Sequence, residues 1–277
     1  MNSTASLGAG LGLKAEHFAQ ALACNADGLW YEVHPENYMV GGPRLAWLQR
    51  MAERHALSLH GVALSLAADA DPDLTHLRRL RTLIDQVKPV LVSEHLAWST
   101  WRGQYHPDLL PFPRSHEALV RISDNILRTQ DALGRGIAIE NPSHYLHLQG
   151  HALDEIDFLG ELVRRTGCTL LLDINNVHVS AHNLGFDAQD YLDRFPAHAI
   201  SEVHLAGHSH DDQGALLIDS HDAAIAEPVW ALYRRLVARI GARPTLIERD
   251  GNLPAFDELL AERAIAQAAL DHAGALP

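Results

Sequence analysis

The sequence predicts a closed (β/α)8 barrel, an α/β fold, and three observations support this fold class. The chain of 277 residues is close to the roughly 250 residues of such barrels. Short apolar runs rich in β-branched residues alternate with longer segments of helical periodicity, which is typical of β-α units around a parallel sheet. Reactive side chains stand at the ends of these runs, where the active sites of such barrels lie. We therefore expect one barrel domain over residues 1–277, with an open doubly wound sheet as the alternative.

Eight apolar runs are expected to form strands, at 7–11, 29–33, 57–60, 90–95, 136–140, 169–173, 200–205 and 245–248. Helical periodicity predicts helices over 44–55, 74–87, 115–133, 153–166, 228–240 and 255–272. The glycine-rich segment 8–12 lacks the third glycine of a GxGxxG dinucleotide motif, since Leu13 occupies that position. We interpret this segment as a tight turn that leaves the first strand.

Charge and composition exclude several classes of partner. The formal net charge is −13, with 35 acidic and 22 basic side chains, whereas binding of nucleic acid or an anionic membrane needs clustered Lys and Arg. No apolar stretch could span a bilayer, and the amino-terminal segment lacks the features of an export signal, so a cytoplasmic location is expected. Cys24 and Cys168 form no CxxC pair, so neither a disulfide framework nor a thiolate zinc site is expected. The 19 histidines suggest metal chemistry instead.

Six of the eight expected strands end on a side chain that can bind a metal: His60, His95, Glu140, Asp173, His204 and Glu248. Asp219 and His221 alternate in the loop after the seventh strand, where an extended segment can point both the same way. Placing so many acids and imidazoles at one barrel mouth without cations costs several kcal/mol for each unsatisfied group. The sequence therefore predicts two or three bound ions. Imidazole and carboxylate without thiolate suit iron, manganese or zinc, and a carboxylate such as Glu140 can bridge two ions.

At these residues the chain resembles the multinuclear non-haem iron-dependent oxidases, a family related to barrels of the xylose-isomerase and endonuclease IV type. The resemblance covers nearly the whole chain. It is carried by EVHPENYM at 32–39, LHGVALSL at 59–66, SEHLAWS at 93–99, IENPSHYL at 139–146, LLLDINNVHVSAHN at 170–183 and EVHLAGH at 202–208, together with GAGL at 8–11.

The resemblance implies a mixed-valence Fe(II)/Fe(III) centre of two or three ions and O2 as co-substrate. It also implies oxidation of cysteine residues in a ribosomally made precursor peptide, which a small partner protein presents at the barrel mouth. The chain order of the eight donors above matches the ligand order of the related barrels of the xylose-isomerase and endonuclease IV type. One position differs from the related nucleases, because Asn176 stands where they carry a metal-binding histidine and His178 follows two residues later. Asn176 is a weaker ligand, and His178 replaces it only if the loop turns its ring inward.

Further side chains near the expected mouth are candidates for positioning substrate. His34 and Asn37 leave the second strand and are expected to act in catalysis, by placing substrate or oxygen. Trp98, Trp101 and Tyr105, in a long loop after the fourth strand, are expected to form an apolar wall, and His208 is a candidate support for His204.

Three other functions share parts of this pattern. A metal-dependent hydrolase for abasic DNA has the same ligand order, but it needs a basic face around the mouth, and segments such as 32–38 and 207–223 are acidic or neutral. A sugar isomerase is disfavoured because the expected lysine-containing segments are missing. A metal-storage protein requires a closed site, whereas a barrel mouth leaves a free coordination position.

Overall fold

The computed structural model describes residues 7–274 and shows eight parallel strands closed into a barrel in the order β1-β12-β9-β8-β7-β4-β3-β2. The strands are β1 (Ala9–Gly12), β2 (Trp30–Val33), β3 (Ala56–Gly61), β4 (Leu91–His95), β7 (Ala138–Glu140), β8 (Thr169–Asp173), β9 (Ile200–Ala206) and β12 (Thr245–Glu248). The prediction of a closed barrel is confirmed, and the open sheet is wrong.

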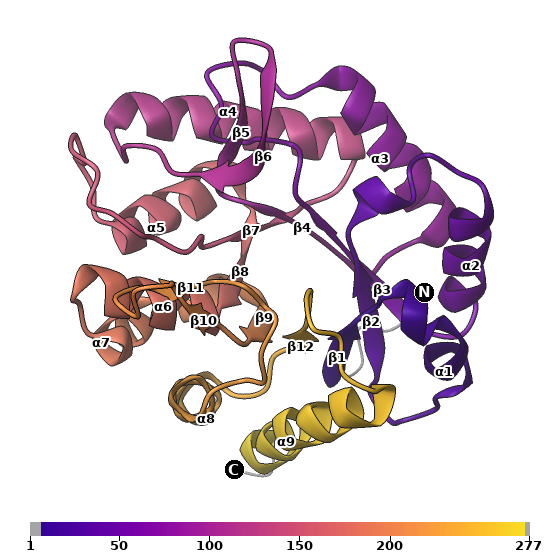
Figure 1. The fold of residues 1–277 in the computed structure, drawn as a ribbon. Coiled ribbons are helices and arrows are strands. Elements are labelled where there is room, and N and C mark those ends of the chain that lie inside the picture. The colour runs from indigo at the N-terminus through magenta and orange to yellow at the C-terminus, as the bar shows by residue number, and fades with distance from the viewer. Residues whose placement is uncertain (1–6, 275–277) are drawn as a thin grey trace.

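Helices surround the barrel as an outer ring (Figure 1). They are α1 (Phe18–Ala23), α2 (Pro43–Ala52), α3 (Leu74–Val87), α4 (His116–Leu133), α5 (Glu155–Thr166), α6 (Ile174–Leu184), α7 (Ala188–Arg194), α8 (Glu227–Ile240) and α9 (Phe256–Gly274). The predicted ranges agree with six of these to within a few residues, but they did not include α1, α6 and α7. No helix within residues 7–274 is both long and apolar enough to cross a bilayer. Residues 1–6, part of the amino-terminal segment in which no export signal is expected, lie outside the described residues.

Local signals in the sequence fix where the helices begin and end. The side chains of Asp73, Ser115 and Asp154 accept hydrogen bonds from backbone N–H groups in the first turns of α3, α4 and α5, which satisfies donors that a helix start leaves free. Gly134 and Gly167 follow α4 and α5 with φ of 64° and 68°, a left-handed conformation that favours glycine.

Trp30 on β2 is fully buried and donates its indole N–H to the carbonyl oxygen of Gly8 at 2.9 Å. A Cβ on Gly10 would lie 2.5 Å from this indole. The glycine-rich segment therefore belongs to strand β1 and makes room for a tryptophan; the prediction of a tight turn there is wrong.

Two small hairpins lie outside the barrel sheet. β5 (Trp98–Trp101) pairs with β6 (Gln104–Leu110), and β10 (Ser209–His210) pairs with β11 (Leu217–Ile218), both antiparallel. The β5–β6 hairpin replaces the loop that the sequence predicted after the fourth strand. Its tip, Arg102-Gly103, has φ of 48° and 79°, which is the backbone of a tight hairpin turn.

Candidate metal centre

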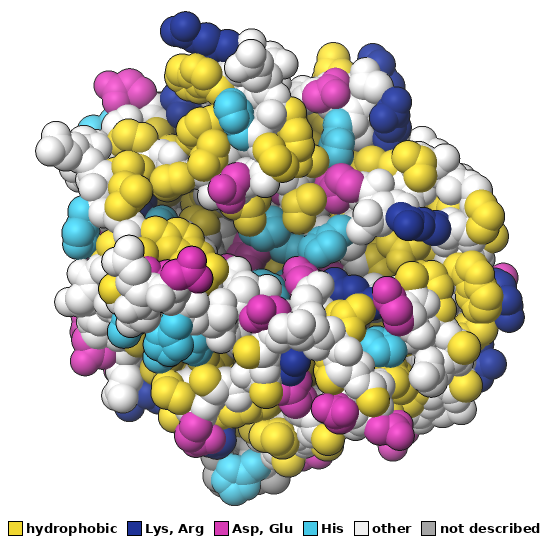
Figure 2. Space-filling view, in the orientation of Figure 1, with side chains coloured by type: hydrophobic (Ala, Val, Ile, Leu, Met, Phe, Trp, Pro, Cys, Tyr) yellow, Lys and Arg dark blue, Asp and Glu magenta, His cyan; other side chains and the backbone are white. Residues whose placement is uncertain are grey.

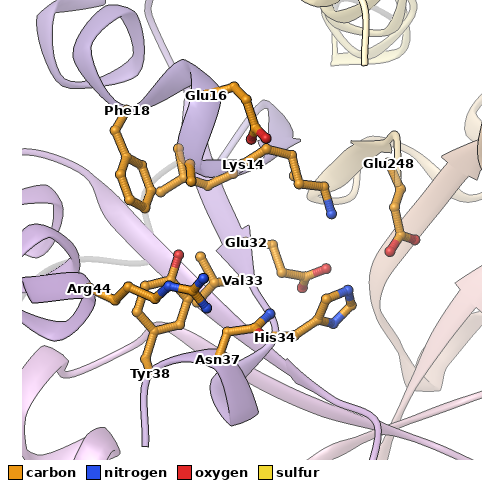
Figure 3. A pocket seen from close by; sticks show the side chains of 13 residues that line it. Lys14, Glu16, Phe18, Glu32, Val33, His34, Asn37, Tyr38, Arg44 and Glu248 are labelled. Carbon is orange, nitrogen blue, oxygen red and sulfur yellow. The ribbon is translucent and has the colours of Figure 1, made fainter. Parts of the chain in front are cut away.

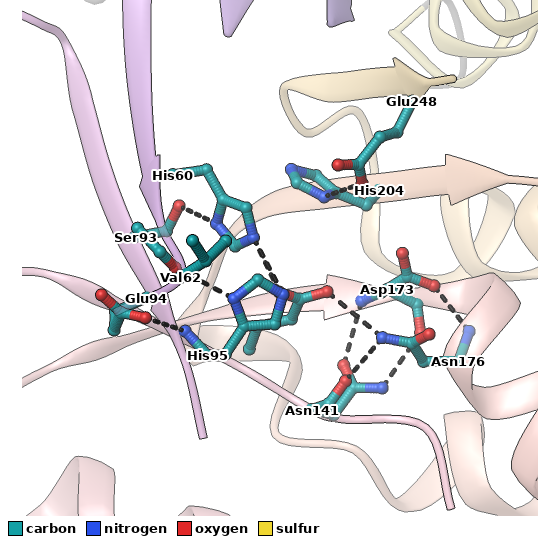
Figure 4. Close-up of polar contacts among 12 residues, drawn as sticks. His60, Val62, Ser93, Glu94, His95, Asn141, Asp173, Asn176, His204 and Glu248 are labelled. Carbon is teal, nitrogen blue, oxygen red and sulfur yellow. Dashed lines mark hydrogen bonds and ion pairs between the residues drawn. The ribbon is translucent and has the colours of Figure 1, made fainter. Parts of the chain in front are cut away.

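The carboxyl ends of the strands bring predicted ligands together at one end of the barrel, and Figure 4 shows His60, His95, Asp173, His204 and Glu248 among them. The parallel register pairs His95 with Glu140 across β4 and β7, and Asp173 with His204 across β8 and β9. His60 and Glu248 stand at the same end, on β3 and β12. Side chains distant in sequence therefore converge because the strands end at the same level.

The first group of ligand atoms surrounds one oxygen of Glu140. Glu140 Oε2 lies 3.0 Å from His60 Nε2 and 3.1 Å from His95 Nε2. The opposite ring nitrogens are held in place, since His60 Nδ1 lies 2.8 Å from Ser93 Oγ and His95 Nδ1 lies 2.9 Å from the carbonyl oxygen of Gly61. Such outer contacts orient an imidazole so that its free nitrogen faces a metal.

A second group lies on the other side of His204. Asp173, His204 and Glu248 each offer one ligand atom, and these atoms lie within 4.8 Å of one another. His60, Glu140 and His204 form a further set of this kind, so the His204 ring adjoins both groups. Asp173 also caps α6 by accepting a hydrogen bond from the Asn176 backbone N–H at 2.6 Å.

Asp219 and His221 complete the mouth from the loop after β11. His221 Nε2 lies 2.7 Å from Asp219 Oδ1, and His221 Nδ1 lies 3.4 Å from Glu248 Oε2. The two side chains meet as predicted, but not through an extended segment, because His221 adopts a left-handed φ of 50°. Asn175 donates to Asp219 Oδ1 at 2.8 Å and thereby fixes that carboxylate.

The sequence left open whether Asn176 or His178 is a metal ligand, and the structure gives these two side chains different surroundings. Asn176 lies 3 % exposed on α6, where its amide N–H group donates to Glu140 Oε1 at 3.2 Å and its Oδ1 has no hydrogen-bond partner. His178 packs against His208 with ring centroids 4.9 Å apart. His208 in turn contacts Asn175 Oδ1 at 2.8 Å, so it supports Asn175 rather than His204.

Several buried atoms of the centre have no hydrogen-bond partner, namely Glu140 Oε2, Asp173 Oδ2, Asn176 Oδ1 and both ring nitrogens of His204. Some of these atoms stand at ion-pair distance from one another without hydrogen-bond geometry. Leaving them unsatisfied is costly. Imidazole nitrogens and carboxylate oxygens are ligands for iron, zinc or manganese, so the residues present fit a centre of more than one ion.

The electrostatics of the centre depend on these close pairs. Burial opposes the charged form of both partners, but the Glu140 carboxylate raises the pKa of His60 to about 10. The neighbouring imidazoles of His95 and His60 lower the pKa of Glu140 to about 2. Burial lowers the pKa of His95. Glu140 and His60 therefore form a buried ion pair. A metal ion that binds both side chains must displace the proton that His60 carries in this pair.

Two buried carboxylates below His204 were not predicted from the sequence. Glu32 Oε1 lies 3.2 Å from His204 Nε2, and Glu202 Oε1 lies 3.7 Å from the same nitrogen. A signal was available, because Glu202 and His204 are two residues apart on one strand and so point to the same face. Asp250, in the loop after β12, was also missed, and its Oδ2 lies 3.8 Å from His221 Nδ1.

A cavity of about 300 Å³ opens above the centre and is lined by six of the ligand candidates: His95, Glu140, Asn176, Asp219, His221 and Glu248. Tyr105 and Leu109 of the β5–β6 hairpin also line it. The face that contains the barrel mouth is hollowed at its centre, and histidine and acidic side chains gather in this hollow (Figure 2). His34 lines the cavity as well, and its Nδ1 lies 3.1 Å from the carbonyl oxygen of His60.

Residues 8–271 match the model of one protein family, described as RiPP precursor modification enzyme MbnB/TglH/ChrH, where RiPP denotes a ribosomally synthesised and post-translationally modified peptide. The chain belongs to this family. Similar proteins include a UPF0276 protein of Caulobacter vibrioides, which is 63% identical over 264 residues and is matched over 95% of this chain and 94% of its own. A UPF0276 protein of Paraburkholderia phytofirmans is 48% identical over 257 residues, covering 91% of this chain and 84% of its own. The suspected family membership is therefore confirmed.

Solved structures of similar fold are named for different activities. D-Psicose 3-epimerase from Clostridium cellulolyticum superposes with a TM-score of 0.59 at 11% identity, over 96% of this chain and 98% of the other. Endonuclease IV from Thermus thermophilus gives a TM-score of 0.53 at 15% identity, over 96% and 100%. At these identities the likeness shows the fold alone, which is the xylose-isomerase type of barrel that the sequence predicted.

Proposed function

We propose that this chain is an iron-dependent oxidase that uses O2 to modify cysteine residues of a ribosomally made precursor peptide. The observation that carries the proposal is the pair of ligand sets that share His204, His60–Glu140–His204 and Asp173–His204–Glu248, which an open cavity reaches at Glu140 and Glu248. Membership in a family of precursor-peptide modification enzymes supports a peptide as the substrate. The cysteine residue supplies the electrons and O2 accepts them.

The proposed metal ligands are the nine residues that the sequence analysis predicts: His60, His95, Glu140, Asp173, Asn176, His204, Asp219, His221 and Glu248. Bound iron supplies a Lewis acid that lowers the pKa of a cysteine thiol and a redox partner for O2. Glu140 lies between the His60–His95 side and Asn176, which suits a bridging carboxylate. His34 and Asn37 are proposed to position the substrate, because both line cavities at the mouth.

The surroundings of the cavity fit a peptide more readily than a nucleic acid. Two acids outside the proposed ligand set, Asp108 and Asp250, line the cavity, and negative charge there disfavours a phosphodiester backbone. Tyr105 and Leu109 offer apolar contacts at the rim, with 59% and 39% of their surfaces exposed. We also propose that the protein acts in the cytoplasm and that a small partner protein presents the peptide.

The test combines the protein, reconstituted with ferrous iron without oxygen, with candidate cysteine peptides encoded beside its gene. Oxygen uptake and peptide mass spectrometry then report the reaction. We expect a mass change located at cysteine, lost when that cysteine is replaced by serine, because a hydroxyl is a poor ligand for iron. His95→Ala should abolish turnover. His198→Ala is the matched control, because His198 precedes β9 at the opposite end of the barrel.

One result would contradict the oxidase proposal. If the iron-loaded protein leaves every such peptide unchanged but cleaves abasic DNA in a manner that depends on Glu248, the hydrolytic function is correct instead. Cleavage that persists in Glu248→Gln would point to a contaminating nuclease.

A further inference from the structure

A second cavity, of about 170 Å³, opens beside the metal centre between the ends of β1 and β2. Lys14, Asn37, Tyr38 and Arg44 line its outer part, and Glu32 and Glu248 line it toward the centre. His34 and Glu248 line both this cavity and the larger one at the mouth. A ligand that occupies the side cavity can therefore extend to the metal centre.

The cations of this cavity are unusual in so acidic a chain. Lys14 is one of only two lysines in a protein with a net charge of −13. Its amino group pairs with Asp250, whose other oxygen lies 3.8 Å from His221 Nδ1. Arg44 has no ion pair with any residue in the range 7–274. Figure 3 shows Arg44 and Tyr38 on one side of the cavity and Glu248 on the other.

Two neutral donors stand near Arg44 without protein partners. Neither the Asn37 amide nor the Tyr38 hydroxyl makes a side-chain hydrogen bond to the described part of the chain, although Tyr38 is only 5% exposed. Burial raises the pKa of Tyr38 to about 12, so the hydroxyl keeps its proton and can donate. Two cationic and two neutral donor groups thus line one small cavity.

We propose that this cavity is a subsite for a carboxylate of the peptide substrate. The guanidinium of Arg44 offers two parallel N–H donors that match a carboxylate, and Lys14, Asn37 and Tyr38 add single donors. The inner wall carries Glu32 and Glu248, which disfavours a doubly charged phosphate more than a singly charged carboxylate. This proposal rests on the proposed function, because it gives the subsite to the same substrate.

The ligand's two ends would then be recognised separately: its acid by the side cavity and its thiol by the metal centre. The carboxylate comes either from the carboxyl terminus of the peptide or from an Asp or Glu side chain near the reactive cysteine. Holding both ends fixes the orientation of the cysteine before reaction.

The test measures dissociation constants on the iron-loaded protein under anaerobic conditions, with four small probes. They are N-acetylcysteine, its amide, the amide of N-acetyl-Cys-Glu, and N-acetylalanine, which has the acid without the thiol. We expect at least one of the two acidic cysteine probes to bind about tenfold more tightly than the neutral amide, as charge-assisted hydrogen bonds predict. Preference for N-acetylcysteine identifies a terminal carboxylate, and preference for the Cys-Glu amide identifies a side chain.

Arg44→Gln should reduce this preference to about twofold or less, and Lys14→Met should reduce it in part. The matched control is Arg50→Gln, since Arg50 lies on the same helix but stacks on the Trp47 ring, 4.6 Å from its centroid. Arg50→Gln should keep the full preference. If the acidic probes and the amide bind equally in the unaltered protein, or if Arg44→Gln and Arg50→Gln act alike, the subsite is refuted.

The same measurements separate this proposal from the proposed function. If N-acetylalanine binds in a manner that depends on Arg44 while no probe gains affinity from its thiol, the subsite stands and the cysteine-oxidase proposal fails. If all thiol probes bind with no preference for the acid, the subsite fails and the cysteine-oxidase proposal is unaffected.

Discussion

Metal binding by this protein should release protons, and its affinity should therefore weaken as the pH falls. Only a neutral imidazole can bind a metal. In the metal-free centre the Glu140 carboxylate raises the pKa of His60 to about 10, so His60 carries a proton at pH 7. Carboxylates around His204 and His221 raise the pKa of both rings well above the usual value. His95, whose pKa is lowered by burial, is already neutral.

The structure gives the size of the effect. An ion bound by His60, His95 and Glu140 must displace about one proton, from His60, and ions that also use His204 and His221 must displace about two more. Each released proton changes the affinity about tenfold per pH unit below the pKa of the group. Titration with Zn²⁺, which avoids oxidation, in two buffers of different ionisation enthalpy measures proton release directly by calorimetry. Between pH 6 and 8 the tightest site should gain roughly a hundredfold in affinity.

Two glutamate variants test the cause. Glu140→Gln removes the charge that raises the pKa of His60, so proton release at the first site should fall toward zero and affinity should fall as well. Glu155→Gln is matched, because Glu155 also contacts a histidine, His144, at 3.1 Å, but away from the centre. It should behave as the unaltered protein does. Affinities that do not change from pH 6 to 8, or equal effects of the two variants, would refute the reasoning.

Three further predictions concern the metal content, one hydrogen bond to a ligand and one packing contact in the barrel. Protein loaded anaerobically should hold two or three irons per chain by metal analysis, and fewer than one of any transition metal in folded protein contradicts the centre. Asn175→Ala should weaken the ion held by Asp219 about tenfold, as competition with a chelator measures, while His210→Ala should not. Gly10→Ala should lower the free energy of unfolding by about 1–3 kcal/mol because its methyl group meets Trp30; Gly160→Ala, where nothing lies within 4 Å, should leave it unchanged or raise it slightly in urea titrations.

The barrel could be predicted because each strand is a short apolar run and ends on a polar group. The ranges 169–173 and 245–248 agree with β8 and β12. The missed helix α6 begins directly after Asp173, which both ends a strand and caps the helix, so no loop signal separates them. The β5–β6 hairpin was missed because its turn, Arg102-Gly103, lacks the Asn-Gly or Asp-Gly pair that marks such turns.

The candidate ligands could be predicted from chain order, but their supports could not. Strand ends converge in any such barrel, and this placed His60, His95 and Glu140 together. The contacts of Asn175 with Asp219 and His208 depend on how α6 meets the loops after β11 and β9, and no local pattern encodes that packing. Nor did the sequence indicate that Lys14 and Arg44, on different elements, line one cavity.

Glu32 and Glu202, the two buried carboxylates next to His204, raise the question of whether a further ion binds in the barrel interior. Glu32, Glu202 and His204 could hold an ion by distance, but burial and the neighbouring Glu32 raise the pKa of Glu202 to about 8. In the metal-free centre Glu202 is therefore mostly protonated at pH 7, so an ion bound there must displace a proton from a carboxyl group as well, whereas His221 and His204 hold the pKa of Glu248 well below its usual range and leave that carboxylate ready to bind. Glu202→Gln should thus leave the metal content unchanged and Glu248→Gln should lower it. A loss of one metal from Glu202→Gln, in protein that unfolds at the usual temperature, would place an ion in the barrel interior.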